Sequence, residues 1–313
     1  MTYIKPKKLI KGDLIGIISP ASSPDDLTLI ESGVEYIERL GYQTILGTNV
    51  GKSRGYLAGT DKERVEDIHQ MFNNKNVKAI FCLRGGYGAF RLLDKIDYQL
   101  IRNNPKIFVG FSEITALQMA FLQKANLITF AGPMVVQNFS KVISRYSEEN
   151  FWRMISSSST PGKLKLPNLD KLPSLNLGIA SGRIVGGNLA VFVSLLGTKY
   201  LPDLNNKILF LEDISEPPYK IDRMINQLRL NKVFKKIQGI ILGGFIDCNE
   251  PDKNKKTLTL EEIWSDYFSS INIPVIHSFP HGHIKDLVTM PIGSKIKLNA
   301  TKGLVEFAES GVR

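Results

Sequence analysis

The stretch that decides the fold is KIFVGFSEITALQMAF, residues 106–121. It opens with the apolar run Ile107–Val109, which has strand propensity, and continues with apolar residues at helical spacing over 114–121. Ser112 therefore lies where a strand passes directly into a helix. Two roles are open to it. It is either a helix N-cap, with Glu113 at the positive end of the helix dipole, or a strained, exposed side chain suited to nucleophilic attack.

The composition fits a globular protein with more than one core. The chain has 313 residues, of which 43% are hydrophobic and 22% are charged. The basic, then apolar N-terminus is predicted to be a first strand and not a signal peptide, because Asp13 and Gly16 interrupt its apolar run. No run approaches the length of a membrane span, so we expect a cytoplasmic protein with no membrane partner.

The net charge of +10 does not by itself indicate a nucleic-acid partner. The lysines are dispersed and are not interleaved with aromatic residues, so a solvated surface with a general attraction for acidic ligands is expected instead. The two cysteines, Cys82 and Cys248, form no metal-ligand pattern and predict no disulfide framework.

Strands and helices alternate in the first half of the chain, which predicts a mostly parallel sheet flanked by helices. Ligands of such sheets bind beyond the carboxyl ends of the strands, where both Ser112 and the run Arg84-Gly85-Gly86-Tyr87-Gly88 fall. The expected strands are 14–19, 42–46, 77–83 and 107–109, and the expected helices open at 22–25, at 60–61 and near 89–93.

The predicted organisation is α/β with two domains and an active site in the cleft between them. Residues 1–155 form the N-terminal domain, 156–181 a Ser-, Pro- and Lys-rich linker, and 182–313 a mixed α/β or β-rich C-terminal domain. The C-terminal expectations are a strand 183–185 with a turn at 186–188, strands 207–211, 237–242 and 274–277, helices 189–196, 221–230 and 260–268, and a closing hairpin 294–298/304–308.

Two motifs that follow strands have both a structural and a functional interpretation. The glycine run after Arg84 either forms a tight turn or brings backbone N–H groups close to an anion, and it is not a dinucleotide-binding fingerprint. Glu212 follows a buried strand and needs a partner, because a buried carboxylate is costly without one. The two candidate partners of Glu212 are Arg223, in a salt bridge, and a catalytic base.

Histidines concentrate near the end of the chain. His277, His281 and His283 lie within seven residues, whereas His69 is placed on a helix and is expected to be solvated. Histidine is the usual acid–base residue near neutral pH. A metal site at His281 and His283 is the alternative, although no further ligand with metal-site spacing accompanies them except Asp286.

A serine, a carboxylate and a histidine that each follow a strand are the parts of a Ser-His-acid hydrolase. Their order along the chain is Ser112, Glu212 and then a histidine, as in α/β-hydrolases, but the G-x-S-x-G motif is absent. The serine belongs to the first half and the other two to the second, so the site would lie between the halves.

The chain resembles the L,D-carboxypeptidase family of serine peptidases, which includes muramoyl-tetrapeptide carboxypeptidases and microcin-immunity peptidases. The resemblance runs over nearly the whole chain and rests on several motifs in order. These motifs are GDLIGIISPASSP from Gly12, FCLRGGYGAFRLLD from Phe81, FVGFSEITAL from Phe108, GGNLAVFVSLLGT from Gly186, LFLEDISEPPYKIDRMINQL from Leu209 and GHIKDLVTMPIG from Gly282.

The resemblance implies a catalytic triad of Ser112 as nucleophile, Glu212 as acid and His283 as base. His283 is preferred to His281 because the family's Gly-His is followed, after a short gap, by Thr-Leu/Met-Pro, which matches Gly282-His283 and Thr289-Met290-Pro291 here. The implied oxyanion donors are the backbone N–H groups of Gly86 and Glu113. The family usually has Asp after the serine, so the Glu113 side chain departs from the family pattern.

The same resemblance implies a substrate and the groups that bind it. The substrate is a small peptide, the cytoplasmic murein tetrapeptide of peptidoglycan recycling, from which terminal D-alanine is released. Arg84 and Tyr87 are the expected substrate contacts, Arg84 to the terminal carboxylate unless it only fixes the turn. No metal or organic cofactor is implied, and a homodimer is expected. The alternatives are a microcin-immunity-type peptidase acting on a peptidyl-nucleotide antibiotic, and a non-catalytic two-domain ligand-binding protein.

Overall fold

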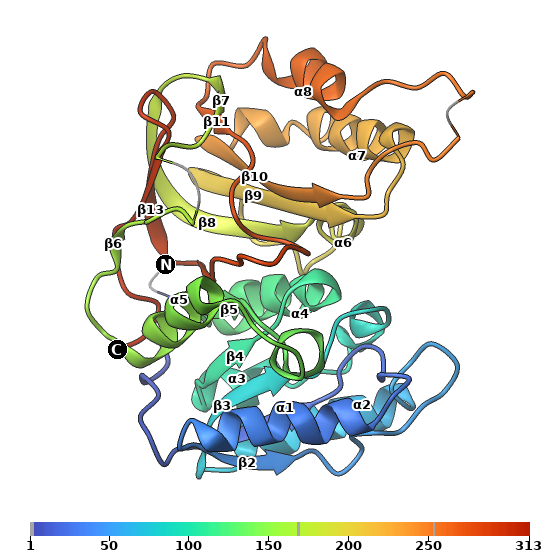
Figure 1. Ribbon diagram of the computed structural model, residues 1–313, viewed down its shortest axis with the longest axis vertical. Coiled ribbons are helices and arrows are strands. Elements are labelled where there is room, and N and C mark those ends of the chain that lie inside the picture. Colours follow the sequence, from blue (N-terminus) through green and yellow to red (C-terminus); the bar gives the residue numbers. More distant parts are fainter. Residues whose placement is uncertain (1–2, 168–169, 253) are drawn as a thin grey trace.

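The computed structural model describes residues 3–167, 170–252 and 254–313, and these form two stacked α/β halves. Figure 1 shows the first half, blue to green, below the second, yellow to red. Within the described residues each half is built on one sheet, of six strands in the first and eight in the second. In the same part of the chain, no helix has the length and apolar character that crossing a membrane would require.

The sheet of the first half is parallel except at one edge, in the order β12-β5-β4-β3-β1-β2. Its strands are β1 (Leu14–Ile18), β2 (Gln43–Leu46), β3 (Val77–Cys82), β4 (Ile107–Val109), β5 (Thr129–Ala131) and β12 (Met290–Ile292). The helices are α1 (Thr28–Arg39), α2 (Asp61–Asn73), α3 (Tyr98–Asn103), α4 (Thr115–Ala120) and α5 (Arg145–Ser156), with short turns η1 (Ala89–Leu92), η2 (Ser112–Ile114), η3 (Phe121–Ala125) and η4 (Val135–Phe139).

Strand β3 shows how this sheet is covered on both faces. Ala79 and Phe81 point into the cluster under α1, η4 and α5, whereas Ile80 and Cys82 point into the cluster under α2 and α4. This alternation follows from the two-residue period of a strand, and a sheet buried on both faces requires strands that are apolar throughout. The second cluster continues into the other half of the molecule, so the two halves share one core.

The sheet of the second half is mixed, in the order β6-β14-β13-β8-β9-β10-β11-β7. Strands β8 to β11 run parallel, and antiparallel strands flank them on both sides. The elements are β6 (Gly162–Lys163), β7 (Ser174–Asn176), β8 (Ile179–Asn188), α6 (Leu189–Ser194), β9 (Lys207–Ile214), α7 (Pro218–Leu230), η5 (Val233–Lys235), β10 (Gly239–Ile246), α8 (Leu260–Phe268), β11 (Val275–Ile276), β13 (Lys295–Asn299) and β14 (Leu304–Phe307). The fold class predicted from the sequence is confirmed.

Three strands of this sheet run further than the sequence predicts. The predicted turn at 186–188 is wrong, because these residues are the last three of β8 and pair in register with β9. Strand β9 includes Glu212 and Asp213, and β10 continues through Gly243 and Gly244, where its register against β9 shifts. Both acidic side chains are therefore held by a strand, which is a stiffer support than a loop.

The segment that follows β11 crosses from one half of the molecule to the other. It leaves the second sheet, passes through residues 277–289, and enters the first sheet as β12, antiparallel to β5. The backbone N–H of Leu287 donates to Ser147 Oγ (2.7 Å), and that of Thr289 donates to Asn150 Oδ1 (2.8 Å), both on α5. This crossing segment carries His283 and ties it to both sheets.

Candidate active site

Ser112 lies on a sharp turn between β4 and the helical segment that leads into α4. Its φ is 61°, in the left-handed region that L residues other than Asn and Asp seldom adopt. The side chain is half-buried, and among the described residues its hydroxyl forms no hydrogen bond, so it caps no helix in this structure. The strained pose predicted for this serine is confirmed, and it leaves the hydroxyl free to react.

The glycine turn packs directly against Ser112. A Cβ atom placed on Gly85 would lie 3.0 Å from Ser112 Cβ and 3.1 Å from its Oγ, so a side chain at this position would crowd the serine. Gly86 has a φ of 109°, and a Cβ there would lie 2.3 Å from Ser22 Oγ. Only glycine fits either position, which explains the pair of glycines. The backbone next to Ser112 is therefore bare.

The side chain of Glu113 performs a task that the sequence does not reveal. Its Oε1 accepts hydrogen bonds from the backbone N–H groups of Gly88 (2.8 Å), Ala89 (2.9 Å) and, at longer range, Phe90 (3.4 Å). Burial raises the pKa of Glu113, and these N–H donors act in the opposite direction. The carboxylate thus joins the serine turn to the glycine turn.

Glu212 and His283 are joined by a hydrogen bond. His283 Nδ1 lies 3.1 Å from Glu212 Oε2, and both side chains are buried. The His283 ring also packs against Phe111, the residue before Ser112, with ring centroids 5.0 Å apart. The structure therefore brings the acid and the histidine together beside the serine turn. No hydrogen bond between Ser112 and His283 occurs within the described part of the chain.

The other oxygen of Glu212 has no hydrogen-bond partner among the described residues, although it is fully buried. Arg223, the alternative partner considered from the sequence, lies instead over the ring of Tyr219. A buried carboxylate with a spare oxygen and no cation beside it favours a neighbouring group that becomes positively charged. His283 is the group in that position.

The other histidines occupy different surroundings. His281 is fully buried, its Nδ1 lies 2.6 Å from the Val288 carbonyl oxygen, and burial lowers its pKa to about 4. His69 is partly exposed, and its Nε2 accepts from the backbone N–H of Asp97. Over the ranges that the structure describes, no three His, Cys, Asp or Glu side chains are placed to hold a metal ion.

A buried polar chain links helix α4 to the second sheet. The backbone N–H of Asn188 donates to Thr115 Oγ1 (3.1 Å), and its side-chain amide donates to Asp213 Oδ1 (2.9 Å). Asp213 also accepts from the N–H groups of Ala190 and Ile214, yet burial raises its pKa to about 6. The position of Asp213 next to Glu212 in the sequence is the only signal that could have indicated this chain.

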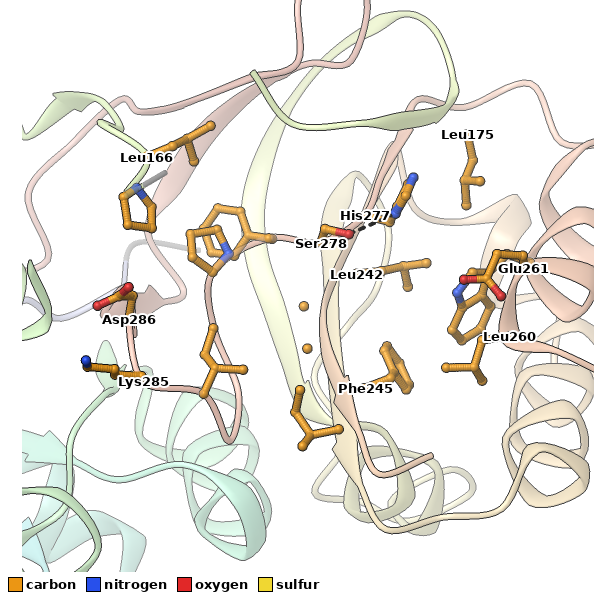
Figure 2. A pocket seen from close by; sticks show the side chains of 18 residues that line it. Leu166, Leu175, Leu242, Phe245, Leu260, Glu261, His277, Ser278, Lys285 and Asp286 are labelled. Atoms are coloured by element: carbon orange, nitrogen blue, oxygen red, sulfur yellow. Dashed lines mark hydrogen bonds between the residues drawn. The ribbon is translucent and has the colours of Figure 1, made fainter. Parts of the chain in front are cut away.

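Two cavities border these residues. One of about 600 Å³ lies between β10, α8 and the crossing segment. Its lining includes Gly243, which packs beside Glu212, and consists mainly of apolar groups such as Trp264 and Phe245. Figure 2 shows Phe245 opposite Lys285 and Asp286 across this cavity.

The second cavity, of about 440 Å³, has a more polar lining that includes Arg84, Ser22 and Ser23. The Nε of Arg84 and the hydroxyl of Ser23 are buried with no partner among the described residues. Tyr87 stands beside this cavity, 54% exposed, with its ring edge-to-face against Tyr56 at 5.2 Å. Arg84 therefore lines this polar cavity, and Tyr87 lies at its edge through Tyr56 and Ser22.

Comparison with known proteins places the chain in one family. Residues 15–132 match the LD-carboxypeptidase N-terminal domain, and residues 181–298 match the LD-carboxypeptidase C-terminal domain. The chain is 39% identical to the probable murein peptide carboxypeptidase of Bacillus subtilis, over 95% of this chain and 92% of the relative. It is 31% identical to the murein tetrapeptide carboxypeptidase of Pseudomonas aeruginosa, over 92% and 94% of the two chains.

A solved structure agrees with this assignment. The microcin C7 self-immunity protein MccF, in complex with aspartyl sulfamoyl adenosine, superimposes with a TM-score of 0.90 at 28% identity, over 99% of this chain and 100% of that one. Both sequence and fold thus lead to the same group of proteins, and the chain belongs to the LD-carboxypeptidase family of serine peptidases.

Proposed function

We propose that this protein is a murein tetrapeptide carboxypeptidase that hydrolyses the L,D-peptide bond before a terminal D-alanine, with Ser112, Glu212 and His283 as its catalytic triad. The observation that carries the proposal is the 3.1 Å contact between Glu212 Oε2 and His283 Nδ1 beside the strained Ser112 turn. This is the arrangement that a serine hydrolase needs, with a base oriented by an acid next to an activated hydroxyl.

The reaction proceeds through an acyl-enzyme. Because Glu212 engages Nδ1 of His283, Nε2 is left to take the proton as Ser112 Oγ attacks the scissile carbonyl carbon. The backbone N–H groups of Gly86 and Glu113 stabilise the tetrahedral oxyanion, at about 3 kcal/mol per donor. His283 then protonates the leaving amine of D-alanine. Water, deprotonated in turn by His283, attacks the ester and restores the serine.

A carboxypeptidase must also recognise the free carboxylate of its substrate. We assign this role to Arg84 with Tyr87, since the Arg84 Nε has no hydrogen-bond partner in the described part of the chain and the side chain lines a polar cavity. A guanidinium forms charge-assisted hydrogen bonds with a carboxylate, which is the chemistry that selects a chain end over an internal peptide. The mechanism uses no metal or organic cofactor.

The second candidate is a peptidase that acts on a peptidyl nucleotide, and the related MccF structure holds aspartyl sulfamoyl adenosine, an aminoacyl group joined to a nucleoside. Trp264 and Phe245, which pack together in the wall of the 600 Å³ cavity, offer an aromatic surface of the kind on which a nucleobase stacks. The two candidates share the triad and differ in the leaving group. Turnover of an aspartyl sulfamoyl adenosine analogue faster than tetrapeptide would favour the second, and inertness toward any L,D-peptide or peptidyl nucleotide would favour a ligand-binding protein.

The proposal includes the organisation of the chain and its cellular setting. Residues 1–155 form the nucleophile domain, 156–181 the connection and 182–313 the domain with the acid and the base. Strands β6 and β7 lie within the connection, and β12 pairs with the sheet of the nucleophile domain. We propose that the enzyme works in the cytoplasm, with a small peptide as its partner and no nucleic acid, and as a homodimer.

The experiment that tests the proposal is the Ser112→Ala variant, assayed for D-alanine release from a murein tetrapeptide. The variant should lose at least about 10⁴-fold in kcat, because the nucleophile is gone. Ser32→Ala, on the exposed face of α1, is the matched control and should keep full activity. A chelator should have no effect on the wild-type enzyme. Full activity in Ser112→Ala would overturn the assignment of the nucleophile.

A further inference from the structure

The glycine turn next to Ser112 is held at its far end by two buried charged side chains. Glu113 has 6% of its surface exposed, and Arg64 has 1%. Both contact the residue Gly88, one at its N–H and the other at its carbonyl oxygen. Charged groups seldom reach this degree of burial without a specific role.

Glu113 supplies the negative side of this clamp. It follows Ser112 directly in the chain, so its backbone belongs to the serine turn while its carboxylate reaches the glycine turn. It binds the N–H groups of Gly88 and Ala89 at 2.8 and 2.9 Å. Hydrogen bonds to an ionised acceptor are about twice as strong as neutral ones, so the distance between the two turns is closely defined.

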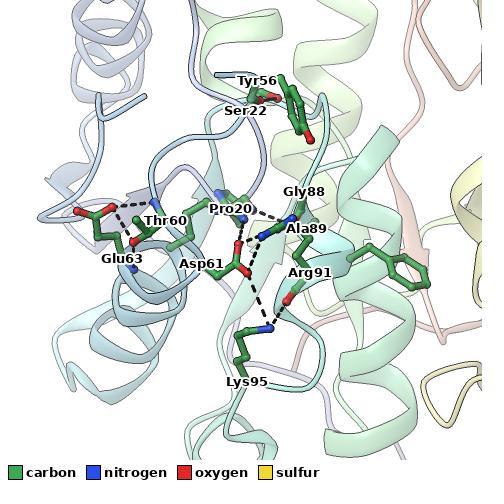
Figure 3. Close-up of polar contacts among 12 residues, drawn as sticks. Pro20, Ser22, Tyr56, Thr60, Asp61, Glu63, Gly88, Ala89, Arg91 and Lys95 are labelled. Atoms are coloured by element: carbon green, nitrogen blue, oxygen red, sulfur yellow. Dashed lines mark hydrogen bonds and ion pairs between the residues drawn. The ribbon is translucent and has the colours of Figure 1, made fainter. Parts of the chain in front are cut away.

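Arg64, on α2, supplies the positive side. Its Nη1 donates to the carbonyl oxygens of Gly88 (2.8 Å) and Pro20 (2.7 Å), and its Nη2 donates to Asp61 Oδ1 (2.7 Å). Asp61 also accepts from Arg91 and lies 3.8 Å from Lys95, on the outer side of the cluster (Figure 3). The guanidinium is thus fixed by three acceptors and cannot move without breaking them.

We propose that the Glu113 carboxylate is a positioning residue of the reaction, which together with Arg64 holds the Gly85–Gly88 turn in the place where its N–H groups meet the oxyanion. The inference rests on the proposed function, since it assigns a purpose to the turn only if an oxyanion forms at Ser112. Gly85 and Gly86 have no side chains to anchor them, and the clamp at Gly88 substitutes for that missing anchorage.

The clamp acts on the transition state and not on the bound substrate. Oxyanion donors contribute in proportion to how well they point at the charge that develops, and a shift of about 1 Å is enough to lose one donor. The loss should appear in kcat with little change in KM, because the donors make no comparable contact with the ground-state peptide.

The test compares two substitutions at one position, assayed for D-alanine release at a temperature where both variants are folded. Glu113→Gln keeps the shape and one acceptor but removes the charge, and kcat should fall about tenfold. Glu113→Ala leaves the N–H groups of Gly88 and Ala89 without an acceptor, and kcat should fall about 100-fold or more, the loss typical of one oxyanion donor. KM should stay within about twofold in both variants.

A peptide boronic acid provides a readout that a purely structural role would not move, because its tetrahedral adduct with Ser112 places an oxygen in the oxyanion position. Its affinity should fall in parallel with kcat/KM across the two variants. Glu309→Gln is the matched control, since Glu309 also accepts from a backbone N–H, that of Lys295, but lies just after β14 in the second half, and it should leave kcat unchanged.

The inference is overturned if the two variants keep wild-type kcat and boronate affinity, even if they unfold more easily. It is also overturned if KM rises while kcat is kept. Failure of the proposed function has a different signature, because Ser112→Ala would then keep its activity and the wild-type protein would not bind the boronate.

Discussion

Two buried carboxylates lie near Ser112, the proposed nucleophile, and their surroundings are opposite. The Glu113 carboxylate accepts hydrogen bonds from backbone N–H groups, which do not titrate. Glu212, which is fully buried, binds only the ring of His283 and has a second oxygen without a partner among the described residues. The donors around a buried carboxylate therefore decide its role. Backbone N–H groups make it an anchor for the chain, whereas a histidine ring makes it the partner of a positive charge that forms during a reaction.

The largest effect is expected at the second of these carboxylates. Glu212→Gln should lower kcat by about 10⁴-fold, because the neutral amide neither holds the His283 tautomer nor stabilises its cation. Steady-state kinetics of D-alanine release measures the loss, and circular dichroism checks the fold. A loss of less than tenfold would mean that Glu212 does not act on the reaction through His283.

The next largest effect is expected in the free energy of unfolding, at Arg64, which with Glu113 forms the clamp on the glycine turn. Arg64→Met should lower the free energy of unfolding by about 3–5 kcal/mol, because Asp61 and two carbonyl oxygens lose a buried charged donor. Urea unfolding measures this change. Arg145→Met, on the solvent face of α5, should leave the midpoint unchanged, and equal midpoints for the two variants would contradict a buried clamp.

The smallest effect depends on pH and involves Asp213, the neighbour of Glu212. Its pKa is raised to about 6 from 3.8, mainly by burial, so the folded protein holds a proton there that the unfolded chain releases. Stability is therefore fully present below about pH 4 and falls as the pH rises to 6, by about 3 kcal/mol from this group. The difference in unfolding free energy between wild type and Asp213→Asn should change by that amount across this window. A difference that is constant with pH would mean that Asp213 does not titrate there.

Local patterns allowed much of the fold to be predicted. The helix after Thr60 begins with the expected cap, since Thr60 and Glu63 form reciprocal side-chain bonds to each other's backbone. Helix α8 spans the residues predicted for it, and β13 and β14 pair as the expected hairpin. These elements depend on caps, periodicity and short connections, all of which are visible over about ten residues of sequence.

The errors arise where distant segments decide the outcome. The glycines at 186–187 and 243–244 resemble turn signals, yet both pairs lie inside strands of the second sheet, where neighbouring backbone or side chains come too close for a Cβ atom. The role of the Glu113 side chain depends on a turn 25 residues away in the sequence. Family motifs identify the candidate residues of the site, but they do not reveal the hydrogen bonds between them. Contacts between residues far apart in the sequence produce no periodic sequence pattern.

Strand β12 comes from the second half of the chain but completes the sheet of the first half, and this has a consequence for folding during synthesis. During synthesis β5 emerges long before β12, so this edge of the first sheet stays open until residues 290–292 have been made. Closing that edge pulls the crossing segment across the molecule and sets His283 in place. Placement of His283, the proposed base, and completion of the sheet that carries Ser112 therefore depend on the same strand, and the proposed site is incomplete until β12 has been synthesised.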